Sequence, residues 1–233
     1  MQNALRYVAG TLILLSSIAH AQEHSYSVCA TGSFTSSSKL FSNITNPDEL
    51  ARGQFLALDD VFSGGIEVRR ELNTIRVTIG FSVEYLERTN TSENPDSSIL
   101  IPVKDGFRSV PIELTALFFL PFQHDRLRVG IGGGVGVYLG NRIYEYARTP
   151  APTIEHRIGF GIHVVTGVEY LFAGPLSVRG TVEFRDVQFE TVNRFQQPVT
   201  VYDRTLIQLP QEPLYSRVNI DGTRLTLGLA YSF

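Results

Sequence analysis

The chain of 233 residues contains no tryptophan and one cysteine, Cys29. A single cysteine cannot form an internal disulfide, and we expect it to be a buried, inert thiol. The net charge is −3 and the charged residues are spread along the chain, so no basic patch indicates binding to nucleic acid. Beyond the first residues, no apolar run is long enough for a transmembrane helix. These absences exclude a disulfide-linked domain, a nucleic-acid-binding protein and a helical membrane protein.

The amino terminus has the features of a cleaved secretory signal. Arg6 precedes an apolar run from Tyr7 to Leu15, which is followed by the small-x-small sequence Ala19-His20-Ala21. The run is too short to cross a bilayer, and small residues at this spacing are typical of a peptidase cleavage site. We therefore predict a signal peptide over residues 1–21 and one mature domain over residues 22–233.

Residues 128–140, RVGIGGGVGVYLG, are rich in glycine. They do not form a dinucleotide fingerprint, because Val135 and Leu139 stand five positions after Gly130 and Gly134. They are not a Walker loop either, because no lysine follows the glycines. The glycines alternate with aliphatic residues instead, and that period is typical of a β-strand. The pattern therefore predicts no nucleotide cofactor. It predicts a β-strand with glycines along one face.

Apolar and polar residues alternate in eight segments of the chain. These segments are residues 25–34, 65–72, 74–86, 110–120, 128–140, 157–172, 176–189 and 223–233. Short turns at 73–74, 123–125 and 173–175 alternate with long, polar, irregular connections at 35–62, 87–108, 141–156 and 190–222. Such sorting is typical of an outer-membrane barrel with short periplasmic turns and long extracellular loops. Residues 199–209 could also pair as a hairpin beyond the membrane, so ten strands remain an alternative.

A secreted, lipocalin-like barrel would show the same alternation but would place its apolar face inside. Glycines on the non-apolar face argue against it, because they make room inside a narrow barrel for long side chains from opposite strands. Aromatic residues near the strand ends form a predicted interfacial girdle. Its members are Tyr85, Tyr138, Tyr170, Phe172, Phe189 and Tyr231. The sequence thus favours an all-β, transmembrane, antiparallel up-and-down β-barrel of about eight strands.

Charged residues of both signs share the inward parity with the glycines. They can pair across a lumen of about eight strands, which side chains fill. The predicted ion-pair core consists of Glu67, Arg69, Arg76, Glu84, Glu113, Arg128, Glu169, Arg179, Glu183, Arg185 and Arg224. This interpretation favours a filled lumen over a conducting or binding site.

Four stretches of the chain resemble a known family. They are VPIELTALFFLP (110–121), VGIGGGVGVYLG (129–140), FGIHVVTGVEYLFAGPLSVRGTVEF (160–184) and LGLAYSF (227–233). They are similar to the outer-membrane β-barrels of Bacteroidetes and related bacteria, the "porin family" with PorT-like and OmpX-like members. The resemblance implies a place in the bacterial outer membrane, in contact with its lipid. The terminal aromatics Tyr231 and Phe233 resemble the insertion signal that the barrel-insertion machinery reads.

Enzymatic activity on such a barrel needs a recognisable set of residues. Lipid A deacylases resemble this scaffold but use a His-x-Ser pair, and none of the histidines precedes a serine at that spacing. We interpret His163 as a hydrogen-bonded lumen residue, and the loop acids 48–49 and 59–60 lack a calcium-loop spacing. No metal or cofactor is predicted.

The sequence therefore predicts a non-enzymatic outer-membrane protein whose exterior loops have a structural role or contact an unknown protein partner. The alternatives are a small porin or conduit for apolar solutes, and an assembly factor of a secretion system, as PorT-like relatives suggest.

Overall fold

The computed structural model describes residues 25–72, 77–96, 99–121, 126–172 and 174–233. The predicted signal peptide and Arg76 therefore lie outside the described residues. Within these ranges, no helix is long and apolar enough to cross a membrane.

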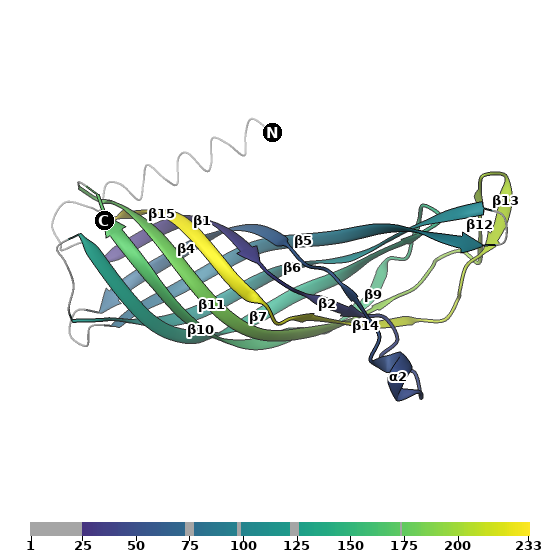
Figure 1. The fold of residues 1–233 in the computed structure, drawn as a ribbon, viewed down its shortest axis with the longest axis horizontal. Coiled ribbons are helices and arrows are strands. Elements are labelled where there is room, and N and C mark those ends of the chain that lie inside the picture. Colours follow the sequence, from purple (N-terminus) through teal and green to yellow (C-terminus); the bar gives the residue numbers. More distant parts are fainter. Residues whose placement is uncertain (1–24, 73–76, 97–98, 122–125, 173) are drawn as a thin grey trace.

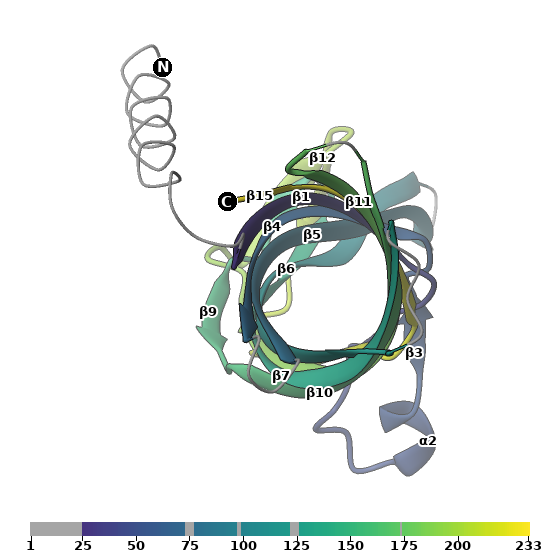
Figure 2. The same ribbon diagram turned by 90° about the vertical axis from the view of Figure 1, so that its left-hand side faces the viewer.

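Eight long strands form a closed antiparallel ring (Figures 1 and 2). They are β1 (Tyr26–Thr35), β4 (Val61–Leu72), β5 (Val77–Asp96), β6 (Ile99–Phe119), β7 (Leu127–Tyr146), β10 (Gly159–Leu171), β11 (Leu176–Asn193) and β15 (Thr223–Ser232). Strand β1 pairs with β15, and β10 pairs with both β7 and β11, which closes the ring. The predicted barrel of eight strands is thus confirmed, and the ten-strand alternative is wrong.

Short elements lie beyond the ring at the end opposite the carboxyl terminus (Figure 1). They are β2 (Lys39–Phe41), α2 (Glu49–Arg52), β3 (Phe55–Ala57), β8 (Thr149–Pro150), β9 (Thr153–His156), β12 (Val199–Tyr202), β13 (Thr205–Gln208) and β14 (Leu214–Ile220). Asp48 caps α2 by accepting a hydrogen bond of 3.0 Å from the Leu50 backbone N–H. The hairpin expected within 199–209 is present as β12 and β13.

The long connections are more regular than the sequence predicts. Strands β5 and β6 remain paired as far as Asp96 and Ile99, and β7 continues to Tyr146. The prediction of irregular loops is wrong here, because the alternation of apolar and polar side chains ends while the backbone pairing continues. Beyond the ring the paired strands need no continuous apolar outer face, so the alternation that marks the strands of the ring is lost. We call residues 87–96, 99–108, 141–156 and 190–220 the exterior extension.

The outer wall of the ring is apolar, as the alternation predicts. Side chains on this face include Phe160, Leu227 and Phe62, which are 72%, 70% and 71% exposed. The opposite face points into the lumen and carries the charged residues, among them Glu84 and Arg185, which are buried. An apolar exterior around a charged interior excludes the lipocalin-like alternative, whose faces would be reversed.

The girdle prediction is wrong for two of its six aromatics. Tyr85, Tyr170, Phe172 and Tyr231 are exposed on the outer wall, whereas Tyr138 and Phe189 are 0% and 2% exposed. Tyr138 and Phe189 lie inside, in an apolar cluster with Phe107, Leu86, Val187 and five further residues of the loop end. Their inward direction follows from their position in β7 and β11, where both have the parity of the lumen-facing residues.

The glycine face of β7 lies inside the ring, but the glycines make room for different neighbours from those predicted. A Cβ atom on Gly134 would lie 2.8 Å from ring atoms of His163, and one on Gly136 would lie 2.9 Å from the Tyr138 ring. A Cβ atom on Gly132 would overlap the backbone carbonyl oxygen of Ala116. The glycines therefore accommodate aromatic rings and a closely approaching strand. Of the long acidic and basic side chains, Glu113 is a neighbour at Gly136.

Candidate functional site

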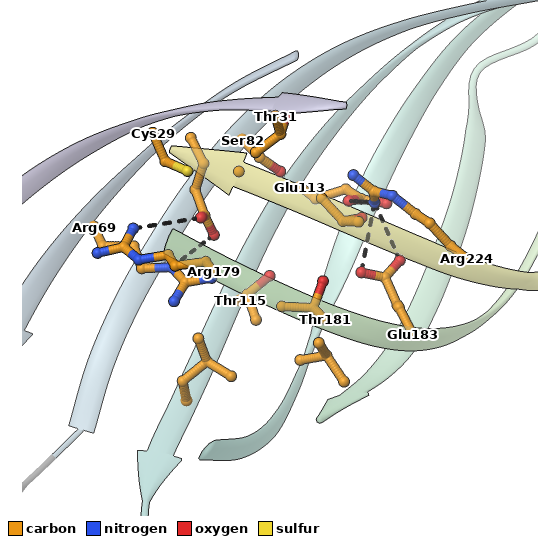
Figure 3. Close-up of a pocket in the computed structure, with 15 residues that line it drawn as sticks. Cys29, Thr31, Arg69, Ser82, Glu113, Thr115, Arg179, Thr181, Glu183 and Arg224 are labelled. Carbon is orange, nitrogen blue, oxygen red and sulfur yellow. Dashed lines mark hydrogen bonds and ion pairs between the residues drawn. The ribbon is translucent and has the colours of Figure 1, made fainter. Parts of the chain in front are cut away.

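The barrel interior brings charged side chains into two layers (Figure 3). The first lies toward the turn end of the ring, where the carboxyl terminus is located (Figure 1). Arg69 Nε lies 2.9 Å from Glu67 Oε1, and Arg179 Nε donates to Glu169 Oε1 at 2.9 Å. Arg179 Nη1 also lies 3.8 Å from Glu67 Oε2. Ser177 donates a hydrogen bond of 2.6 Å to Glu169. This turn-side layer therefore contains two carboxylates and two guanidinium groups.

The second layer lies toward the loop end and is centred on Arg224. Its guanidinium nitrogens lie 2.8 Å from Glu113 Oε2, 3.2 Å from Glu183 Oε1 and 3.1 Å from Glu84 Oε2. Arg185 Nη1 lies 3.6 Å from Glu84 Oε2. The hydroxyl groups of Tyr138 and Ser63 donate hydrogen bonds to Glu113 and Glu84, respectively. Buried carboxylates are thus paired or hydrogen-bonded, as their removal from water requires.

Two ion pairs of the loop-side layer cross the lumen, Arg224–Glu113 and Arg185–Glu84, whereas Glu183 pairs with Arg224 from the neighbouring strand β11. Strand β15, which carries Arg224, is four strands from β6, which carries Glu113, in both directions around the ring of eight. The same separation applies to Arg185 on β11 and Glu84 on β5. Side chains from opposite walls of the barrel therefore meet at its axis and fill the cross-section of the lumen at this level.

Nine of the eleven predicted core residues lie in these two layers: Glu67, Arg69, Glu84, Glu113, Glu169, Arg179, Glu183, Arg185 and Arg224. Arg76 lies outside the described residues. Arg128 lies near the turn end instead, where its Nη1 is 3.3 Å from Glu71 Oε2 and about a third of each side chain is exposed. Glu71 was missed, although it shares the parity of Glu67 and Arg69 in β4.

Above the loop-side layer, the lumen is closed by apolar side chains that the sequence analysis also missed. Phe107 and Phe189 contact each other edge to face, with ring centroids 6.2 Å apart. Leu40 from β2 and Val218 and Ile220 from β14 complete the same cluster. Between the two ionic layers, a cavity of about 40 Å³ remains, so side chains nearly fill this part of the lumen.

His163 is buried next to the loop-side layer, and its Nε2 lies 2.9 Å from Thr115 Oγ1. Donor atoms of Glu113, His163 and Glu183 lie within 4.8 Å of one another, a spacing that a metal ion can use. However, Arg224 bridges the two carboxylates at 2.8 and 3.2 Å. A divalent ion beside this guanidinium would place two cations in contact, so we interpret the group as part of the ion-pair layer.

The two residues of the predicted insertion signal lie at the turn end of β15. The Tyr231 and Phe233 rings are stacked with centroids 6.5 Å apart, and Phe233 stacks on Tyr26 at 6.2 Å. The Phe233 backbone N–H donates to the Tyr26 carbonyl at 2.8 Å. The last residue therefore extends the pairing between the first and last strands.

No protein-family model matches the chain, and no curated protein matches it. Among solved structures, it is similar to the outer membrane protein OprG from Pseudomonas aeruginosa, with a TM-score of 0.57 and 12% identity over 91% of this chain and 98% of OprG. Neisserial surface protein A has a TM-score of 0.48 and 12% identity over 89% of this chain and 97% of its own. The outer membrane protease OmpT from Escherichia coli has a TM-score of 0.40 and 11% identity over 90% and 94%.

The ring of eight strands and the similarity to OprG define the class of protein: the chain has the fold of a bacterial outer-membrane β-barrel. At 12% identity the likeness to OprG shows the fold alone. A fold by itself does not define an activity.

Proposed function

We propose that this protein is a non-enzymatic, integral outer-membrane barrel with a sealed lumen, which acts through its exterior extension. The observation that carries the proposal is that side chains fill the lumen at three successive levels along the barrel axis. These levels are the two ionic layers and the apolar cluster around Phe107, Tyr138 and Phe189. The apolar outer wall supports placement in a membrane, because water would not favour so much exposed aliphatic and aromatic surface.

The exterior extension is ordered by its own small cores, so it can present a defined surface. Ile101, Ala147 and Ile207 form one core, and Ala151, Phe195 and Leu209 form a second. Arg142 binds Asp105 through two nitrogens at 2.8 and 2.6 Å and stacks over Tyr144 at 4.4 Å. Burial raises the pKa of Tyr144 above its ordinary value.

The hairpin of β12 and β13 supplies an apolar patch on this surface. Val201 and Leu206 are directly opposite each other and are 67% and 66% exposed. Tyr202 and Ile207 alternate with them and contact the core of the extension. An exposed apolar pair on a supported hairpin is suited to contact with a protein partner.

Conductance in a planar lipid bilayer tests the sealed lumen. We expect the purified protein to insert without a steady current, because the layers leave a cavity of about 40 Å³ between them. A general porin reconstituted in the same way provides the positive control. A stable ohmic current from the wild-type protein would contradict the proposal.

One observation favours a second function, that of a conduit for apolar solutes. The outer wall has a hollow of about 620 Å³ over β5, β6, β7 and β10. Its apolar lining includes Phe81, Leu114, Val135, Phe160 and Ile162. Faster uptake of an apolar solute into vesicles that contain the protein, and loss of that uptake in Phe160→Asp, would favour this function. The resemblance to Bacteroidetes porins, with the PorT-like assembly role, stays a prediction.

A further inference from the structure

A cavity of about 530 Å³ lies at the turn end of the barrel, outside the turn-side layer. Residues from all eight strands of the ring line it, and Arg69, Glu169 and Arg179 of the turn-side layer form its inner boundary. Farther in, the described residues enclose cavities of about 10 and 40 Å³ before the loop-side layer. The space is therefore a vestibule with a closed floor, and its volume is in the range of small-molecule sites.

The described lining residues of the vestibule carry more positive than negative charge. The cations are Arg69, Arg126, Arg128 and Arg179, and the anions are Glu71 and Glu169, which gives 4 − 2 = +2. Arg126 is exposed and makes no ion pair with any described residue. Arg128 pairs with Glu71 at 3.3 Å, but a third of each side chain remains exposed, so Arg128 is available to an anion that enters.

Buried polar atoms on the wall of the vestibule lack hydrogen-bond partners among the described residues. Thr78 is 4% exposed and its hydroxyl group has no partner. Arg179 is 6% exposed, and its Nη1 has no hydrogen bond, although it lies 3.8 Å from Glu67. Such groups are rare in protein interiors, and an acceptor from another molecule, water or a ligand, would satisfy each of them.

We propose that the vestibule binds a small organic anion through a carboxylate or phosphate group. Arg126 and Arg128 provide the charge at the entrance, and the Thr78 hydroxyl and Arg179 Nη1 provide donors at the floor. The ring of Phe119 lines the same space and offers apolar contact to the remainder of the ligand. This proposal rests on the proposed function in one respect. Because the lumen is sealed, a ligand that enters the vestibule from the periplasm binds there and does not pass through the barrel.

Isothermal titration calorimetry of the full refolded chain in neutral detergent tests this proposal, with citrate and pyrophosphate as separate probes at low ionic strength. We expect one of them to bind, and the one that binds identifies the carboxylate or the phosphate as the preferred group. The variant carrying Arg126→Gln and Arg128→Gln should bind about tenfold more weakly or worse, because both entrance charges are lost. Thr78→Val should also weaken binding while leaving the charge unchanged.

The matched control carries Arg157→Gln and Arg217→Gln, which remove the same charge from the loop end, where both side chains pair with Glu190. Its affinity should equal that of the wild type. The shift between heated and unheated samples on a gel reports folding. Arg126→Gln alone changes one exposed side chain, so we expect this variant to fold and to bind the probe more weakly than the wild type. The proposal is overturned if neither probe binds the wild type, or if the control loses as much affinity as the vestibule variants. Conductance is measured separately, so an open pore would refute the sealed lumen without deciding this binding result.

Discussion

Replacement of Gly134 by leucine should destabilise the barrel, because the lumen has no space for a side chain at this position. The first added atom, Cβ, would overlap the Leu114 carbonyl oxygen and lie 2.8 Å from the His163 ring. His163 is held by Thr115 at 2.9 Å and is enclosed by the loop-side layer, so its ring cannot move freely. The remaining atoms of leucine would press on the same group.

Overpacking of a filled interior typically costs about 1–3 kcal/mol. We expect Gly134→Leu near the upper end of that range, because backbone as well as a ring must move to admit the side chain. A loss of about 3 kcal/mol changes the folding equilibrium constant by roughly two orders of magnitude. The effect is therefore well above the error of a denaturant titration.

Urea unfolding in lipid vesicles measures this difference, with two control substitutions. Gly32→Leu changes a glycine of β1 whose Cβ would meet no atom within 4 Å, so it should leave stability nearly unchanged. Val135→Leu changes the next residue of β7, which is 56% exposed on the outer wall, and should also be nearly silent. If Gly134→Leu is tolerated while Val135→Leu is damaging, the assignment of inner and outer faces is wrong.

Three further predictions concern other parts of the chain. Arg224→Met should lower the free energy of unfolding by about 3–5 kcal/mol, because Glu84, Glu113 and Glu183 lose their shared partner, whereas the exposed Arg157→Met should have little effect in the same urea titration. Deletion of Phe233 should reduce the amount of protein in outer-membrane fractions, because the signal read at insertion and the pairing with Tyr26 are lost; normal amounts with a normal gel shift would contradict this. The mature protein should begin at Gln22, and amino-terminal sequencing that finds an intact Met1 would refute the predicted signal peptide.

The sequence determined which residues face inward and which face outward. Side chains alternate strictly along a strand, so one apolar position fixes the face of all its neighbours, as Ile131, Val135 and Leu139 show in β7. The same reasoning identified the strands of the ring and the charged residues on its inner parity. These properties are local, because they depend on the order of residues within a single strand.

Tertiary structure decided which inward residues meet and at what height along the axis. Arg224 and Glu113 are 111 positions apart and contact each other because the stagger of a closed barrel brings opposite strands to one level. Period-two alternation contains no information on that stagger, so it could not separate the two ionic layers from the apolar cluster. It also could not show that Tyr138 and Phe189 close the lumen, or that β5 and β6 remain paired to Asp96 and Ile99. Alternation defines the direction of each side chain, but closure of the ring defines its neighbours.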